Sequence, residues 1–247
     1  MIQLERFGDD RIKPYVEWSK NKGKLCAYCY EPANTRDHIP SKVFLDDNLP
    51  DFNSTIPACE ECNKGFSKDE EYVACSIDYL KSCIWSGHVL KDKTIRSFER
   101  SILLEKLVKN QFYLNEDGSI ITISTEGDER FKKIMIKLAV GHARHDHDYM
   151  GPYDGPHDVD YSIFNDESDY NDFDFYQKMD ICPEIGSRGY VFAVDIKTGQ
   201  TYHTWTNVQS GNYTYHIHDE KDKKVVTIII GKFFLCSVRL IQECGEY

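Results

Sequence analysis

Apolar residues recur at helical spacing in three segments of this chain. The first segment opens with Ser67-Lys68-Asp69-Glu70, an order typical of a helix N-terminus whose serine caps the first turn while the glutamate reaches back to it. The stripe that follows consists of Val73, Ile77, Leu80 and Ile84. We therefore expect an amphipathic helix that begins at Ser67.

Two further helices are predicted in the middle of the chain, over 94–112 and about 128–145. The stripe of the earlier helix consists of Ile95, Phe98, Ile102, Leu103 and Leu107. The stripe of the later helix consists of Phe131, Ile134, Met135, Leu138 and Ala139. A short alternating segment, SIITIST (119–125), predicts a strand between them.

The C-terminal part of the chain has the alternating pattern of β-structure. From residue 189 onward, five such segments are separated by turn residues: GYVFAVDI, QTYHTWT, NYTYHIH, VVTIII and KFFLCSVRL. We expect them to form an antiparallel meander of about five strands. The preceding stretch, 146–184, is acidic and contains several glycines and prolines, so it is interpreted as a loop or irregular insertion.

These patterns indicate an α+β protein in three parts. Residues 1–85 form an N-terminal module with a lead segment, 86–147 a helical region, and 148–247 an acidic insertion followed by an antiparallel β domain. Residues 146–184 contain twelve Asp or Glu and one basic residue, whereas the other 208 residues hold 29 of each sign. The net charge of −11 is therefore local and need not repel nucleic acid from a distant site once salt screens it.

Two Cys-x-x-Cys pairs, Cys26/Cys29 and Cys59/Cys62, have the spacing of a structural zinc site. No run of about 18 apolar residues and no signal-like N-terminus is present, so we expect a cytoplasmic protein without membrane spans, in which paired cysteines bind metal more readily than they form disulfides. The alternatives are unligated core cysteines or a redox motif. The remaining cysteines, expected to be small buried residues, are Cys75, Cys83, Cys182, Cys236 and Cys244.

A candidate catalytic group lies between and beside these pairs. His38 has a side-chain pKa near neutrality and can take a proton from water. Asp37 beside it and Asn63 directly after Cys62 offer oxygen ligands for Mg²⁺. Asn53 could orient the loop or the imidazole by hydrogen bonds. Alone, an Asp-His pair before Pro40 would be interpreted as a surface turn.

The segments CAYC, TRDHIP and FNSTIPACEECNKGFSKDE resemble the HNH endonucleases, whose ββα-metal module often carries a zinc site of two cysteine pairs. The Asp-His-Ile, the central Asn and the late Asn-x-Gly are also similar to the HNH domain of RNA-guided CRISPR nucleases. The resemblance covers about residues 24–72. It implies that His38 is the general base, that Asp37 and Asn63 hold the catalytic metal, and that Asn53 orients the base.

The resemblance further implies a metal-dependent endonuclease that hydrolyses phosphodiester bonds in DNA, or in RNA, with Mg²⁺ or Mn²⁺ at the catalytic centre and Zn²⁺ in the cysteine site. Asn63, where many members have His, favours Mg²⁺ or Mn²⁺ over imidazole-preferring metals. A restriction or anti-phage effector is one expectation. The alternative is a non-catalytic, zinc-stabilised adaptor that binds nucleic acid or protein.

Other patterns give weaker indications. His142, His145 and His147 could form a second metal site or simply end a helix. The aromatic residues Tyr202, Trp205, Tyr213 and Tyr215 alternate along strands as sheet faces or as a stacking platform for bases. The acidic segment 146–184 is interpreted as a solvent-exposed loop or as a docking site for a basic protein partner. The sequence leaves open whether the protein forms a homo-oligomer. Candidate phosphate contacts are Lys20, Lys22, Lys24, Arg36, Lys42, Lys64 and Lys68.

Overall fold

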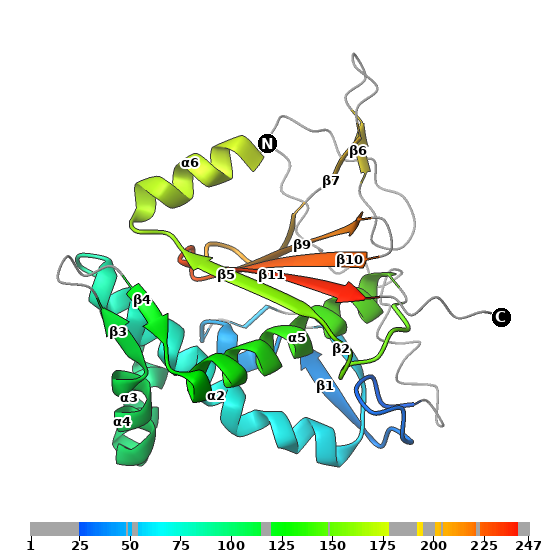
Figure 1. Cartoon of the computed structure of the whole chain (residues 1–247), viewed down its shortest axis with the longest axis horizontal. Helices are drawn as coiled ribbons and strands as arrows, with labels where there is room; N and C mark the ends of the chain where they lie inside the picture. The colour runs from blue at the N-terminus through cyan, green and yellow to red at the C-terminus, as the bar shows by residue number, and fades with distance from the viewer. Residues whose placement is uncertain are drawn as a thin grey trace.

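The structure, a computed structural model, describes residues 25–47, 49–50, 54–114, 120–147, 149–177, 192–194, 201–203, 205–220 and 223–241. Within these ranges the protein is a mixed α+β structure with an antiparallel sheet at the C-terminal end, as predicted (Figure 1). The same ranges contain five α-helices, two more than the sequence indicated. Asn53, Lys20, Lys22, Lys24, Cys182 and Cys244 lie outside the described residues.

The N-terminal part is a hairpin followed by a long helix. Strand β1 (Thr35–Ile39) pairs antiparallel with β2 (Ser54–Ala58), and a short 3-10 helix, η2 (Lys42–Phe44), lies in the connection. Helix α2 (Glu60–Ile84) begins two residues after β2 ends. This order places the second cysteine pair at the junction of hairpin and helix.

The predicted start of this helix is wrong. Helix α2 begins at Glu60, seven residues before the expected Ser67, and its N-cap is Cys59, whose sulfur accepts a hydrogen bond from the backbone N–H of Cys62. Ser67 lies exposed within the helix, and Glu70 bonds Ser41 instead of reaching back to it. The sulfur of Cys59, a member of the cysteine cluster, therefore caps the helix in place of the hydroxyl of Ser67 that the pattern indicated.

The predicted helix 94–112 is divided into two. Helix α3 (Asp92–Arg100) and helix α4 (Ile102–Asn110) meet at Ser101, whose extended backbone ends α3 and whose hydroxyl accepts the N–H of Leu104 to cap α4. Because the axis breaks there, part of the expected stripe faces outward: Ile102 and Leu103 are exposed. The chain then forms a small hairpin of β3 (Phe112–Leu114) and β4 (Ile120–Ile123), which confirms the predicted strand.

Helix α5 (Thr125–His147) confirms the third predicted helix. It lies between the N-terminal hairpin of β1 and β2 and the C-terminal sheet (Figure 1). Its apolar stripe is buried, with Phe131, Ile134 and Met135 fully enclosed. Gly141 lies so close to Ile39 of β1 that a Cβ there would be 2.6 Å from the end of the isoleucine side chain. The absence of a side chain at Gly141 thus lets α5 approach the hairpin closely.

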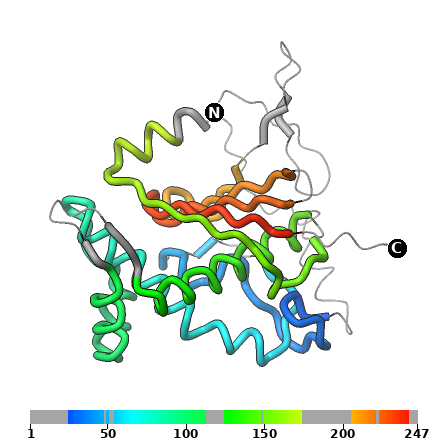
Figure 2. Tube along the Cα trace, viewed as in Figure 1, coloured from blue at the N-terminus to red at the C-terminus, as the bar shows by residue number. Residues whose placement is uncertain are grey.

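The sheet has the strand order β5-β11-β10-β9-β8 and is antiparallel throughout. Three strands of the predicted meander are present in this sheet: β9 (Tyr213–Glu220), β10 (Lys223–Ile230) and β11 (Phe234–Ile241). A fourth strand, β8 (Thr206–Gln209), was not predicted as a separate strand and pairs with β9. The fifth, β5 (Asp158–Ile163), comes from the acidic segment and lies beside β11, as Figure 2 shows. The two segments that were expected to begin the meander pair separately, as β6 (Phe192–Val194) and β7 (Thr201–His203).

The interpretation of 146–184 as a loop is therefore wrong for much of its length. Besides β5 it contains helix α6 (Glu167–Gln177). The segment DVDYSI alternates strictly, and in the sheet its acidic and serine positions are exposed while Val159, Tyr161 and Ile163 are partly buried. This is the pattern of an edge strand with one face toward water, and the high local charge obscured it.

One buried apolar cluster runs through all three predicted parts of the chain. It contains Ile56 of the hairpin, Val73 of α2, Leu138 of α5, and Val226 and Val238 of the sheet. The N-terminal hairpin thus shares its core with elements that follow it by more than eighty residues. Among the described residues no helix is both long enough and apolar enough to cross a membrane.

Candidate metal centre and the His38 strand

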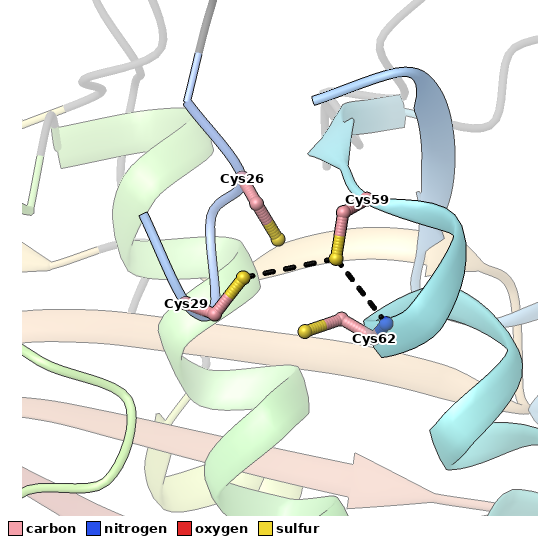
Figure 3. Close-up of side chains that lie close together, drawn as sticks. All are labelled: Cys26, Cys29, Cys59 and Cys62. Carbon is pink, nitrogen blue, oxygen red and sulfur yellow. Dashed lines mark hydrogen bonds between the residues drawn. The ribbon is translucent and has the colours of Figure 1, made fainter. Parts of the chain in front are cut away.

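The four cysteines of the two pairs converge, as the spacing predicted. The turn after Leu25 provides Cys26 and Cys29, and the junction of β2 and α2 provides Cys59 and Cys62 (Figure 3). The four sulfurs lie within 4.8 Å of one another, and the Sγ atoms of Cys29 and Cys59 are 3.7 Å apart. This convergence is inconsistent with four cysteines dispersed through the core.

This donor set fits a structural zinc ion. Zinc–sulfur bonds of about 2.3 Å in a tetrahedron place neighbouring sulfurs about 3.8 Å apart, close to the Cys29–Cys59 separation. Thiolate ligands prefer Zn²⁺ to Mg²⁺, and four cysteines leave no coordination position open for a substrate. The cluster could therefore hold a metal that fastens the hairpin to α2. Among the described residues it is the one such group of His, Cys, Asp and Glu.

The local electrostatics of the cluster differ between its members. The backbone N–H of Cys62, which points at the sulfur of Cys59 from the first turn of α2, lowers the pKa of the Cys59 thiol. Burial instead raises the pKa of the Cys62 thiol. A divalent cation would stabilise both as thiolates, so metal binding in this site releases protons and weakens as the pH falls.

His38 is the fourth of the five residues of β1, half-buried and opposite Thr55 of β2. Burial, followed by the positive charge of Lys42, lowers the pKa of its imidazole. Two buried polar atoms in this cross-strand pair, Nδ1 of His38 and Oγ1 of Thr55, have no hydrogen-bond partner among the described residues. Buried polar atoms without partners are uncommon and indicate a site for a water molecule or a ligand.

Asp37 points away from His38, into the protein, because successive residues of a strand face opposite sides. Its side chain is buried. Oδ2 accepts a hydrogen bond from the hydroxyl of Tyr28 at 2.6 Å and forms an ion pair with Nζ of Lys137 at 2.7 Å. Burial, reinforced by Asp37, raises the pKa of Tyr28 well above its ordinary value, so the phenol remains a donor. The carboxylate is thus held firmly, and its role as a metal ligand stays a prediction.

Lys137 of α5 is the residue of this region that the sequence analysis missed. Its ammonium is 1% exposed and contacts Asp37 of β1, Glu70 of α2, and the hydroxyl of Ser41, which follows β1. One cation therefore ties three elements together beneath the His38 strand. The available signal was its place on the apolar stripe of α5, between Ile134 and Leu138, where an exposed lysine would not be expected.

Asn63, in the first turn of α2, lies against the beginning of β1. Its amide nitrogen donates to the carbonyl of Arg36 at 3.2 Å and to Oγ1 of Thr35 at 3.3 Å. These bonds bring Asn63 to β1, and the side chain of Thr35 faces the same side of the strand as Asp37, opposite to His38. Asn53, the predicted orienting residue, falls outside the described part of the chain.

The second predicted metal site is not formed by the three histidines of α5. The ring of His142 is buried, stacks on Tyr215 and hydrogen-bonds the hydroxyl of Tyr213. His145 hydrogen-bonds Asp146, and His147 lies beside the ammonium of Lys224. The three side chains therefore contact different partners, and their place at the end of a helix suits the helix dipole.

Tyr213 and Tyr215 are buried on the sheet face that contacts His142 of α5, which confirms their interpretation as sheet-face residues and not as a stacking platform. Trp205 is half-buried and packs on Phe173 and His216, and the side chain of Tyr202 is outside the described set. The basic residues Arg36, Lys42, Lys64 and Lys68 are exposed on β1, η2 and α2.

Comparison with known proteins adds no relative. No family of known proteins matches the chain, nor does any curated protein, nor any solved structure.

Proposed function

We propose that this protein is a metal-dependent endonuclease of the HNH type that hydrolyses phosphodiester bonds in DNA. Support comes from the order of elements: a two-stranded hairpin with His38 in its first strand, a following helix with Asn63 in its first turn, and four cysteines that converge beside the start of this helix. This order agrees with the resemblance in residues 24–72. RNA is the alternative substrate of the same chemistry.

The observation that carries the proposal is the state of His38. A general base must be neutral at the working pH and must have a lone pair to receive the proton. The lowered pKa keeps the imidazole neutral, and its Nδ1 has no protein partner within the described residues. The hydroxyl of Thr55, directly across the hairpin, also has no partner in the described part of the chain and can hold the water that His38 deprotonates.

Asn63 and Asp37 are the oxygen donors for the catalytic metal. Asn63 uses its amide nitrogen on β1, which leaves its carbonyl oxygen as the ligand atom. The contacts of Asp37 with Tyr28 and Lys137 fall on Oδ2, so Oδ1 would be the ligand, oriented by these outer partners. When bound, Mg²⁺ or Mn²⁺ neutralises the phosphate and the leaving 3′ oxygen, which gives 5′-phosphate ends.

Phosphate contacts would come from the exposed Arg36, Lys42, Lys64 and Lys68, which flank the His38 strand. Four such contacts would make binding strongly salt-dependent, because each neutralised phosphate releases counterions. The acidic positions of β5 lie on a different element, at the edge of the sheet. They therefore need not oppose the substrate.

The proposal is tested by incubating supercoiled plasmid with the zinc-loaded protein and Mg²⁺ or Mn²⁺. We expect nicking that His38→Ala reduces by about 10²–10⁴-fold, the usual contribution of a general base. His157→Gln is the matched control, because His157 is also half-buried with a pKa lowered by burial, yet lies before β5. Nicking lost equally in both variants would point to contamination or misfolding.

A second pair of variants tests the metal ligand. Asn63→Asp keeps an oxygen donor at this position, whereas Asn63→Ala removes it. We expect Asn63→Ala to need much more Mn²⁺ than Asn63→Asp for the same rate. A Mn²⁺ titration followed by electron paramagnetic resonance gives the same comparison without activity. Equal Mn²⁺ affinity in both variants would exclude Asn63 as a ligand.

The burial of Asp37 favours the second candidate, a non-catalytic adaptor stabilised by zinc. A carboxylate that is 6% exposed and bound to an ammonium group is a structural element in many proteins. This candidate predicts that the wild-type chain and His38→Ala bind DNA or a protein partner equally and that neither binds Mn²⁺ nor cleaves.

A further inference from the structure

A cavity of about 160 Å³ lies away from the cysteine cluster, where the N-terminal hairpin region meets the sheet. Its walls come from η2 and the residues after it, from α2, from α3, and from the turns that precede β9 and follow β10. The turn before β9 is fastened to the region of η2, because the amide of Asn212 donates to the carbonyl of Phe44 and the backbone N–H of Asp46 donates to Gln209. The cavity is thus a junction between two parts of the fold.

Three lysines converge on this cavity from different elements. Lys81 of α2 donates to the carbonyl of Gly231, and Lys93 of α3 donates to the carbonyls of Val43 and Leu45. Lys91, directly before α3, pairs with Asp46 at 2.7 Å and reaches Asn212. These bonds hold the three ammonium groups in place around the space.

The lysines make the cavity electropositive. Burial, followed by repulsion from Lys91, lowers the pKa of both Lys81 and Lys93. Two carboxylates also face the cavity, but Asp46 is paired with Lys91, and Asp78 accepts hydrogen bonds from the ring of His88 and the backbone N–H of Lys91. Three cations against two engaged carboxylates leave an excess of positive charge.

The remaining walls are apolar or carry neutral donors. Ala74, Ile77 and Ile230 form an apolar side, while Thr94 in the first turn of α3 adds a hydroxyl. The side chains of Lys91 and Asp46 are 31% and 48% exposed, so the cavity reaches solvent at that end. Cationic donors opposite an apolar wall suit a small anion with an organic part.

We propose that this cavity binds a small phosphorylated anion, a phosphate monoester whose oxygens take the remaining ammonium donors of Lys81, Lys91 and Lys93. A free phosphate ion and a mononucleotide share this chemistry, and the mononucleotide would place its base on the apolar wall. The site is separate from His38 and does not depend on the nuclease proposal.

Binding at this place would tie the hairpin region to the sheet. The segment η2 begins three residues after β1 ends, and the other wall is the pair of sheet turns. A ligand that binds only the folded protein stabilises it by an amount that grows with the logarithm of its concentration above the Kd. We therefore expect the ligand to raise the melting temperature and to slow hydrogen exchange in η2.

The test is isothermal titration of the full-length, zinc-loaded protein with inorganic phosphate, with adenosine monophosphate and, as the neutral control, with adenosine. We expect saturable binding of one or both phosphorylated probes and no binding of adenosine. Binding of the mononucleotide alone identifies a nucleotide as the source, and binding of phosphate alone identifies the free ion.

Two variants locate the site by different means. Lys91→Gln removes one cation and should weaken binding by roughly ten- to a hundredfold, the contribution of a charge-assisted hydrogen bond. Ala74→Met keeps every lysine and fills the space, so it should weaken binding at least as much. Lys109→Gln is the control, because Lys109 makes only an i,i+4 pair with Glu105 on α4.

Each outcome decides the proposal. Loss of binding in Lys91→Gln and Ala74→Met, with retention in Lys109→Gln, supports it. If neither phosphorylated probe binds, or if both cavity variants bind as the wild type does, it is overturned. Circular dichroism and the melting temperature without ligand show whether a variant is folded. If Lys91→Gln does not fold, Ala74→Met still gives an answer.

Discussion

The hairpin and the five-stranded sheet are both antiparallel, but they are stabilised in different ways. The hairpin consists of two strands of five residues each, a size that is marginal in water on its own. It is held by four sulfurs at one end and by the Asp37–Lys137 ion pair on its inner face. Three strands of the sheet, β9, β10 and β11, have eight residues each, and Val226, Ile228 and Val238 of β10 and β11 are fully buried. The comparison shows that, in the shorter strands of the hairpin, an ion pair and a cluster of possible metal ligands add to the burial of Ile39 and Ile56.

The largest difference should appear when metal is removed. Chelation of zinc, or Cys59→Ser, should abolish a binding free energy of about 10–16 kcal/mol and release the hairpin. Hydrogen exchange should then become fast in β1 and β2 while β9, β10 and β11 remain protected. Cys83→Ser, at an exposed thiol outside the cluster, should keep one zinc per chain. Undisturbed protection of β1 in Cys59→Ser would show that the sulfurs do not hold the hairpin.

Loss of the buried cation should have the next largest effect. Lys137→Met leaves Asp37 and Glu70 buried without their partner and should lower the free energy of unfolding by about 3–5 kcal/mol in urea. Lys133→Met, four residues earlier on α5 and 42% exposed, should cost about 0–1 kcal/mol. Similar losses in the two variants would mean that the buried network contributes little.

A conservative change in the sheet should have a smaller effect and leave the metal site intact. Ile228 is fully buried in β10, so Ile228→Val should lower the free energy of unfolding by about 0.5–1.5 kcal/mol. Zinc affinity should not change, because the sheet does not provide a ligand. A fall in zinc affinity in this variant would show that the two regions are energetically coupled through α5.

The smallest effect concerns the charge of His38. Since its folded-state pKa is lowered below the ordinary 6.5, its contribution to stability is fully present above about pH 6.5 and is lost as the pH falls through the folded-state pKa. The wild type should therefore lose slightly more stability than His38→Gln between neutral and acidic pH in urea unfolding. Any loss of stability from zinc release at low pH would be the same in both proteins and would cancel in the difference between them. An equal loss in both would mean that His38 is not buried as the structure has it.

The local patterns of the chain predicted much of the fold. The stripe of α5 and the alternation of β9, β10 and β11 indicated these elements because their periods match a single buried face. The cysteine cluster was predictable because a two-residue spacer itself directs both sulfurs to one point. The break at Ser101 was not predicted, because the apolar stripe continues through it and its one local signal is a serine whose hydroxyl caps the second helix.

The sequence by itself therefore determined the zinc-binding spacing, the helices with continuous stripes, and the identity of His38, Asp37 and Asn63 as candidates. Only the tertiary structure decided that Asp37 is bound to Lys137, that β5 joins the sheet from an acidic segment, and that three lysines meet at one cavity. The physical reason is the distance along the chain over which each effect acts. Spacing and periodicity act between near neighbours, whereas the partner of a buried charge is chosen by packing between residues that lie a hundred positions apart.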